Sequence, residues 1–129
     1  METKLNVYYA HFMGIYNTPQ EERDIATLEA LGFNVINPNT PGIQVEVDTA
    51  LKQESYMDMF NTVFFSRVRE CEVFAFRALP DGRIPGGVAL EMEYAKDKNK
   101  LIIELPSGFH SRKMGKDDTR EYLKEIGQR

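Results

Sequence analysis

The sequence has little of several residue types that would point to particular classes of protein. It contains one cysteine, two histidines and no tryptophan among 129 residues. One cysteine cannot form an internal disulfide, and so few cysteines and histidines argue against a zinc site of ordinary ligand spacing. There is no apolar run of about 20 residues and no charged-then-apolar leader, which argues against a membrane span and a signal peptide. The net charge of −4 offers no overall attraction for nucleic acid. We therefore expect a cytoplasmic protein with no metal or other cofactor and no membrane or nucleic-acid partner.

What is present is the composition of an ordinary globular protein. Hydrophobic residues make up 42% of the chain and charged residues 28%, a balance far from that of disordered chains. The length is close to the commonest size of one domain and leaves no room for two cores. We expect one domain that covers residues 1–129.

Strand-like and helix-like segments alternate along the chain. Short apolar runs rich in β-branched and aromatic residues predict strands at 4–10, 33–36, 72–76 and 100–105. The capping sequence Thr18, Pro19 and Glu21 predicts a helix that ends at Gly32. Further helices are predicted at 56–70, 87–96 and 117–126, the last capped by Asp117 or Asp118. The segment 38–55 fits neither period for long, so we expect a functional loop with at most one helical turn.

The helix predicted at 56–70 is apolar on more than one face. Phe60 and Phe64 fall on one stripe, whereas Val63 and Phe65 occupy others. A domain of this size has few elements to cover the second side. We therefore expect this helix to pack against its counterpart in another subunit, which makes the protein a homo-oligomer.

The alternation of strands and helices predicts a parallel sheet with right-handed crossovers and helices on both faces. In such sheets ligands bind past the carboxyl ends of the strands. Polar residues that follow the strands, and the glycine-rich start of the helix at 87–96, should meet there. They are His11, Asn37, Asn39, Arg77, Glu104, Gly86, Gly87 and Glu91. Together they predict a site for an anionic or polyhydroxylated small molecule.

Glu91 is the candidate nucleophile. A rotation of 100° per residue places Val88, Met92 and Ala95 on the core stripe of its helix and Glu91 at the border of that stripe. The carboxylate should be half-buried, and the nearby helix N-terminus favours its ionised form. An ionised and partly desolvated carboxylate can attack the anomeric carbon of a sugar and then leave it. The simpler interpretation is a carboxylate that only complements the helix dipole.

The other polar residues at this edge also have two interpretations each. His11 could serve as an acid, a base or a phosphate donor, or it could cap a backbone group. Arg77 suits phosphate recognition through its planar fork, or it pairs with a carboxylate. Glu104 could hold a sugar hydroxyl or balance Arg77. Asn37 could bind substrate or shape a turn.

Three stretches together resemble the nucleoside 2-deoxyribosyltransferase-like family, which includes deoxynucleotide N-hydrolases. They are VYYAHFMGIYN, LEALGFNVINP and ECEVFAFRALPDGRIPGGVALEMEYAKDKNKLIIEL, and the resemblance covers residues from about Lys4 to Leu105. The resemblance implies a flavodoxin/Rossmann-like three-layer α/β sandwich with a parallel sheet of four to five strands. It also implies oligomers, often with sites completed by a neighbouring subunit, and a glutamate nucleophile that corresponds to Glu91. Base or sugar contacts would come from the first loop, here residues 9–13, including Tyr9, His11 and Phe12.

Two departures from the family pattern change what the resemblance implies. His11 and Phe12 stand where the family usually has a small residue and glycine, which would narrow or alter the pocket. The family's catalytic aspartate falls on or near Phe64, and Asp58 is the nearest carboxylate in that helix. A looser resemblance of PGGVALEME to the nucleotide phosphoribohydrolases that resemble lysine decarboxylases implies cleavage of the same bond.

The sequence therefore predicts cleavage or transfer of a nucleoside or nucleotide N-glycosidic bond. Glu91 would be the nucleophile, and substrate contacts would come from Tyr9, His11, Phe12, Asn37, Arg77 and Gly87. The alternatives are a non-catalytic protein that binds or sequesters nucleotides and, less favoured, a structural oligomer with no ligand.

Overall fold

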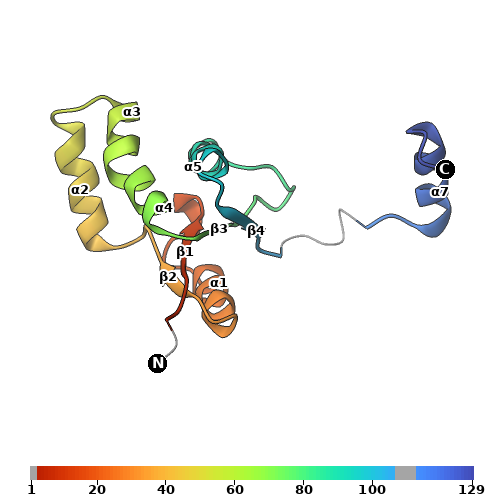
Figure 1. Cartoon of the computed structure of the whole chain (residues 1–129), viewed down its shortest axis with the longest axis horizontal. Coiled ribbons are helices and arrows are strands. Elements are labelled where there is room, and N and C mark those ends of the chain that lie inside the picture. The colour runs from red at the N-terminus through yellow and green to blue at the C-terminus, as the bar shows by residue number, and fades with distance from the viewer. Residues whose placement is uncertain (1–2, 107–112) are drawn as a thin grey trace.

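The computed structural model describes residues 3–106 and 113–129, and a four-stranded parallel sheet forms its centre (Figure 1). The strands lie in the order β2-β1-β3-β4. Their bounds are Asn6–Ala10 for β1, Asn34–Ile36 for β2, Val73–Phe76 for β3 and Leu101–Glu104 for β4. Val7 is in register with Val35 and Val73, and Val73 with Leu101. The predicted α/β class and the flavodoxin/Rossmann-like arrangement are confirmed.

Helices cover both faces of the sheet. The helical segments are η1 Met13–Ile15, α1 Pro19–Ala30, α2 Pro41–Leu51, α3 Tyr56–Met59, η2 Phe60–Phe65, α4 Ser66–Glu70, α5 Gly86–Asp97 and α7 Lys116–Glu125. On one face Leu28 of α1 packs in a cluster with Val7, Tyr9 and Val73. On the other face α4 and α5 cover the alternate residues of the same strands, among them Tyr8 and Phe74. Because side chains alternate along a strand, β1 contributes to both cores.

The start and end of α1 follow the sequence signals. Thr18 accepts a hydrogen bond from the backbone N–H of Glu21, and Pro19 occupies the first turn. Gly32 follows the helix with φ of +95°, a conformation that side chains disfavour. Thr18 and Pro19 begin α1 directly after the loop that follows β1, and Gly32 leads the chain from α1 into β2.

The segment 38–55 is a helix for most of its length, and the prediction of a loop was wrong. Thr40 caps α2 by accepting a hydrogen bond from the backbone N–H of Ile43 at 3.2 Å, and Pro41 fills the first turn. Ile43 is buried in a small core with Met59 and Val63. This cap and the apolar contact outweigh the irregular pattern along the rest of the segment.

The segment 56–70 is helical but has three parts, with the π-helical η2 between α3 and α4. Most of its apolar side chains are covered within the chain: Phe60 and Val63 pack against α2, and Phe65 stacks on Tyr94 of α5 at 4.5 Å. Met57 is 50% exposed, so the helix is not buried on all sides. Homo-oligomerisation through this helix stays a prediction.

The carboxyl-terminal helix α7 lies apart from the sheet and from the other helices (Figure 1). Gly115 is its N-cap residue, with no side-chain cap, so capping by Asp117 or Asp118 was wrong. Both aspartates lie instead in the first turn, where their charges complement the helix dipole. Within residues 3–106 and 113–129, no helix has the length and apolar character that a bilayer span requires.

Candidate functional site

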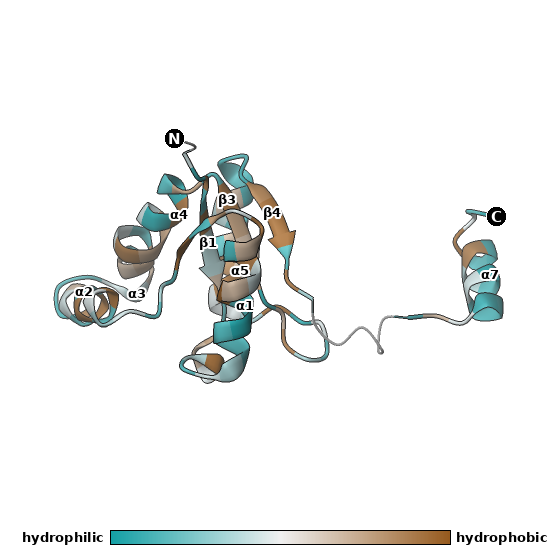
Figure 2. Cartoon of the chain, turned by 90° about the horizontal axis from the view of Figure 1, so that it is seen from below, coloured by the Kyte–Doolittle hydropathy of each residue, from teal (hydrophilic) through white to brown (hydrophobic). Residues whose placement is uncertain are grey.

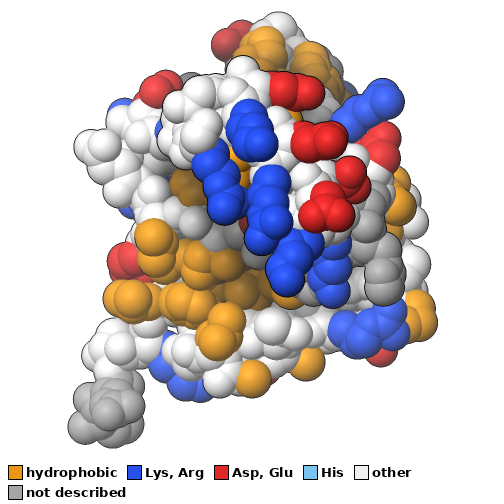
Figure 3. All heavy atoms as spheres, turned by 90° about the vertical axis from the view of Figure 1, so that its right-hand side faces the viewer, with side chains coloured by type: hydrophobic (Ala, Val, Ile, Leu, Met, Phe, Trp, Pro, Cys, Tyr) orange, Lys and Arg blue, Asp and Glu red, His pale blue; other side chains and the backbone are white. Residues whose placement is uncertain are grey.

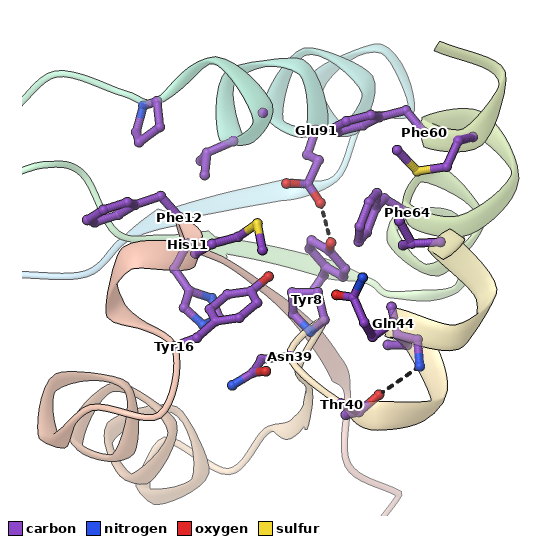
Figure 4. A pocket seen from close by; sticks show the side chains of 18 of the residues that line it. Tyr8, His11, Phe12, Tyr16, Asn39, Thr40, Gln44, Phe60, Phe64 and Glu91 are labelled. Atoms are coloured by element: carbon purple, nitrogen blue, oxygen red, sulfur yellow. Dashed lines mark hydrogen bonds between the residues drawn. The ribbon is translucent and has the colours of Figure 1, made fainter. Parts of the chain in front are cut away.

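A cavity of about 420 Å³ lies at the carboxyl edge of the sheet, on the side covered by α5. Its walls come from β1 and the loop after it, the start of α2, the α3–η2 segment and the first turns of α5 (Figure 4). Aromatic rings form much of the lining, contributed by Tyr8, Phe12, Tyr16, Tyr56, Phe60 and Phe64. The cavity therefore combines flat apolar walls with a few polar groups, as small-molecule sites do.

Glu91 projects from the second turn of α5 into this cavity and is only 7% exposed. Its helix is anchored by Val88 and Ala95, which pack on the sheet and leave Glu91 at the edge of the packed stripe. The hydroxyl group of Tyr8 donates a hydrogen bond to Oε2 of Glu91, as the dashed line in Figure 4 shows. The carboxyl group thus points toward β1 and the centre of the site.

Burial raises the pKa of Glu91 to about 8, and the hydrogen bond from Tyr8 only partly opposes this shift. The expectation that Glu91 sits in a setting that favours its ionised form is not met, because desolvation of the buried carboxylate favours its neutral form. The pKa values of two neighbouring tyrosine hydroxyl groups are raised as well. Burial, followed by the charge of Glu91, raises the pKa of Tyr8 well above its usual value and that of Tyr16 to about 12.

A second polar group in the cavity comes from α2. Gln44 and Asp48 both line it, and the side-chain amide of Gln44 donates a hydrogen bond to Oδ1 of Asp48 at 3.1 Å. Sequence analysis missed both residues because it treated the segment as a loop. The Thr40-Pro41 cap was the signal that could have found them, since residues four apart share one face of a helix.

His11 lines the cavity, but both of its ring nitrogens are already hydrogen-bonded. Nδ1 lies 3.1 Å from the carbonyl oxygen of Tyr9, and Nε2 lies 2.7 Å from Oε2 of Glu21. The ring also stacks on that of Tyr9 with a centroid separation of 3.8 Å. Burial lowers the pKa of His11, whereas Glu21 and the carbonyl group act in the opposite direction.

The two partners of His11 determine where its protons lie. A carbonyl oxygen can only accept, so Nδ1 must carry a proton. Nε2 faces a carboxyl group, and two lone pairs would meet there unless a proton lies between Nε2 and Oε2. Glu21 also accepts from Asn39 and from the backbone N–H of Asn17, and these bonds, with that of His11, lower its pKa against the effect of burial. The pair therefore holds the loop after β1 in place.

Tyr9 and Arg77 lie on the opposite side of β1 from the cavity. Arg77 forms two hydrogen bonds to the carboxylate of Asp24, both at 2.6 Å, and the hydroxyl of Tyr9 donates to the same carboxylate at 2.5 Å. Burial raises the pKa of Asp24, but the hydrogen bonds from Arg77 and Tyr9 outweigh it and the pKa is lowered. Asp24 is thus a carboxylate that balances Arg77 in this structure.

Asn37 also lies outside the cavity. Its side-chain oxygen accepts the backbone N–H of Asn39 at 2.9 Å, and it borders a separate hollow of about 230 Å³ near Phe33 and Asn34. Asn39, which was expected beside the site, lines the main cavity. The structure therefore gathers Glu91, His11, Phe12 and Gly87 around one cavity and places Tyr9, Asn37 and Arg77 elsewhere.

The position at which the sequence resemblance would place an aspartate carries an aromatic ring. Phe64 lines the cavity, while Asp58 is exposed on α3 and does not line it. Within the part of the chain that the structure describes, no three metal-ligating side chains are grouped so that they could hold an ion. The polar side chains that line the cavity carry carboxyl, hydroxyl, amide and imidazole groups.

Comparisons with known proteins support the fold. No protein-family model and no curated protein matches the sequence. Among solved structures, a 2-desoxiribosyltransferase from Leishmania mexicana matches with a TM-score of 0.50 at 14% sequence identity. The match covers 78% of this chain and 63% of the other, so it spans less than two thirds of that protein. At this identity the likeness shows a shared fold.

Proposed function

We propose that the protein cleaves or transfers the N-glycosidic bond of a nucleoside or nucleotide, with Glu91 as the nucleophile. The observation that carries this proposal is a carboxyl group that is almost fully buried yet lines a cavity of about 420 Å³. Aromatic walls suit a planar base, because rings can stack on either of its faces. The likeness in fold to a 2-desoxiribosyltransferase is consistent with this assignment.

In the proposed reaction, an oxygen of ionised Glu91 bonds to the anomeric carbon while the bond from that carbon to the base nitrogen breaks. The base leaves with the electron pair and takes up a proton. Water, or the nitrogen of a second base, then attacks the anomeric carbon, and its proton is released as the bond to Glu91 breaks. The raised pKa makes Glu91 a stronger nucleophile once it is ionised, and Tyr8 holds its carboxyl group in one orientation.

The phenyl ring of Phe64 cannot protonate the leaving base, so another group must supply this proton. We assign this role to Asp48, the second acidic side chain that lines the cavity. Phe12, His11 and Gly87 would contact the substrate directly. Tyr9 and Arg77 would act through the network behind β1, and Asn37 through the turn that carries Asn39.

Release of free base provides the test. The protein is incubated with deoxynucleosides and deoxynucleoside 5′-monophosphates, and the products are separated by chromatography, with and without a second base as acceptor. Glu91→Ala should lower the rate on the order of a thousandfold. Glu93→Ala, an exposed carboxylate on the same helix, serves as the matched control and should keep the activity. If no substrate in the panel releases base, the proposal is wrong.

A second candidate function is binding without catalysis. The observation that favours it is Phe64, which stands in the cavity wall where the resemblance would place a catalytic aspartate. A binding protein should be stabilised against heat by a nucleoside or nucleotide without releasing base. Glu91→Gln should then bind as tightly as the unaltered chain, whereas base release above the background rate would rule this function out.

A further inference from the structure

Glu21 is a charged residue that is buried beside the cavity. Lysine, arginine, aspartate and glutamate side chains normally lie at the surface, as they do on the face that Figure 3 shows. Glu21 belongs to α1, a helix that is largely hydrophilic (Figure 2). Its side chain is nevertheless only 7% exposed, and that of His11, its partner at 2.7 Å, is fully buried. A carboxyl group in this position requires hydrogen-bond donors around its oxygens.

The side-chain amide of Asn39 is one of these donors. Its Nδ2 lies 3.1 Å from Oε1 and 3.0 Å from Oε2 of Glu21, and 3.1 Å from the side-chain oxygen of Asn17. The proton that lies between His11 and Glu21 is directed along the line that joins them, so Glu21 meets Asn39 only as an acceptor. Three acceptor atoms therefore share the two N–H bonds of this amide, and neither bond is left for a ligand.

The amide oxygen of Asn39 is the polar atom that remains for a ligand. Asn39 lines the cavity, and no group within residues 3–106 and 113–129 donates a hydrogen bond to its Oδ1. Its backbone is held too, because its N–H donates to the side chain of Asn37 at 2.9 Å. The reverse orientation of the amide would bring its oxygen against the oxygens of Glu21. The site therefore offers a fixed acceptor at this point of its wall.

The position of Asn39 suggests which part of a nucleoside it meets. Asn39 and Tyr16 lie on one side of the cavity in Figure 4. Phe60 and Phe64 lie on the other side, near the carboxyl group of Glu91. A base that stacks on the phenylalanine rings would leave the hydroxyl groups of its sugar to face Asn39 and Tyr16. A hydroxyl group can donate to an amide oxygen and accept from a tyrosine at the same time.

We propose that the amide oxygen of Asn39 accepts a hydrogen bond from a hydroxyl group of the bound sugar, and that Glu21 is the positioning residue that holds this oxygen toward the ligand. The inference rests on the proposed function for the identity of the ligand. Glu21 itself does not line the cavity, so it acts on the ligand only through Asn39 and His11. Binding of the sugar then depends on a carboxyl group that the sugar never contacts.

A pair of substitutions that exchanges donor and acceptor tests the role of Glu21. Glu21→Gln presents an N–H group to Asn39, so the amide of Asn39 should turn round and direct its own N–H bonds toward the ligand. The acceptor is then lost. The double variant, Glu21→Gln with Asn39→Asp, again places a donor opposite an acceptor and leaves a carboxylate oxygen for the ligand. It should therefore recover the recognition of the hydroxyl group that Glu21→Gln loses.

Affinities are measured by calorimetry with 2′-deoxyadenosine, 2′,3′-dideoxyadenosine and 2′,5′-dideoxyadenosine, and with the corresponding thymine compounds. Every chain carries Glu91→Gln, so that release of base does not disturb the titration. With Glu21 and Asn39 intact, one of the two hydroxyl groups should improve binding roughly fivefold. Asn39→Ala and Glu21→Gln should each reduce this ratio to about one, and the double variant should restore most of it. Each ratio is taken within one protein, so a general loss of stability cancels.

Asn61→Ala is the control, because Asn61 is exposed on η2 and does not line the cavity. It should keep the ratio of the unaltered residues. A ratio that survives Asn39→Ala would overturn the inference, as would a double variant that behaves like Glu21→Gln or a complete lack of binding. The proposed function has its own test in base release by the unaltered chain. Nucleosides that bind with the expected ratio but are never cleaved would contradict catalysis and leave this binding contact in place.

Discussion

The buried carboxyl group of Glu91 should make the stability of the protein depend on pH in a defined direction. The folded chain holds this proton until the pH reaches about 8, whereas the unfolded chain releases it near 4.5. Between these values the folded state binds more protons than the unfolded state, so the free energy of unfolding falls as the pH rises. Glu91→Gln removes the titrating group and keeps an oxygen that can accept the hydrogen bond from Tyr8.

The size of the effect follows from the shift. One titrating group changes the free energy of unfolding by roughly 1.4 kcal/mol per pH unit inside this window. From about pH 5.5 to about pH 7.5 the unaltered chain should therefore lose roughly 3 kcal/mol relative to Glu91→Gln. Urea denaturation of both proteins at the two pH values measures this difference. Titrations of other groups cancel, because the two chains share them.

The same measurement on Glu93→Gln provides the control, since Glu93 is exposed on the same helix. That variant should follow the unaltered chain at both pH values. If Glu91→Gln also follows it, burial does not hold a proton on Glu91. The assignment of a desolvated nucleophile would then lose its physical basis.

Two further predictions concern the polar networks on either side of β1. Arg77→Met leaves the carboxylate of Asp24 buried and unpaired, so the free energy of unfolding in urea should fall by about 3–5 kcal/mol. Arg83→Met breaks an ion pair whose arginine is 84% exposed, and should cost less than about 1 kcal/mol; equal losses would contradict the burial argument. Glu21→Gln removes the carboxylate that raises the pKa of His11, so an NMR titration should show this pKa shifted further down, and an unchanged value would refute the pairing.

The strands and α1 could be predicted because their signals are local. Buried parallel strands are continuous apolar runs, and the cap at Thr18 and the turn at Gly32 mark both ends of α1. The same kind of cap at Thr40 marks α2, but the weak apolar pattern after it hid the helix. No local signal in the sequence predicted the π-helical form of η2, which packs against α2 and α5.

The position of a site residue could be predicted from the sequence where it depends on rotation about one helix. It was harder to predict where a residue could lie on either face of the sheet. Counting along α5 placed Glu91 correctly at the border of the packed stripe. The rule that ligands bind past the carboxyl ends of strands gives the edge but not the face. It therefore could not tell that Tyr8 lines the cavity whereas Tyr9 lies on the opposite face of β1. Successive side chains of a strand point to opposite faces of the sheet. Arg77 was misplaced for the same reason.

The tyrosines of β1 make the same kind of contact with two carboxyl groups whose pKa values shift in opposite directions. Tyr8 and Tyr9 each donate a hydrogen bond to a buried carboxyl group, Glu91 on one side of β1 and Asp24 on the other. Asp24 is paired with Arg77, so its pKa is lowered and its charge is fixed in the framework. Among the described residues that line the cavity there is no lysine or arginine, and burial raises the pKa of Glu91 to about 8. A ligand that places a hydrogen-bond donor or a developing positive charge beside Glu91 would therefore favour its ionised form. Under the proposed function, binding of a sugar would in this way activate the carboxylate for attack.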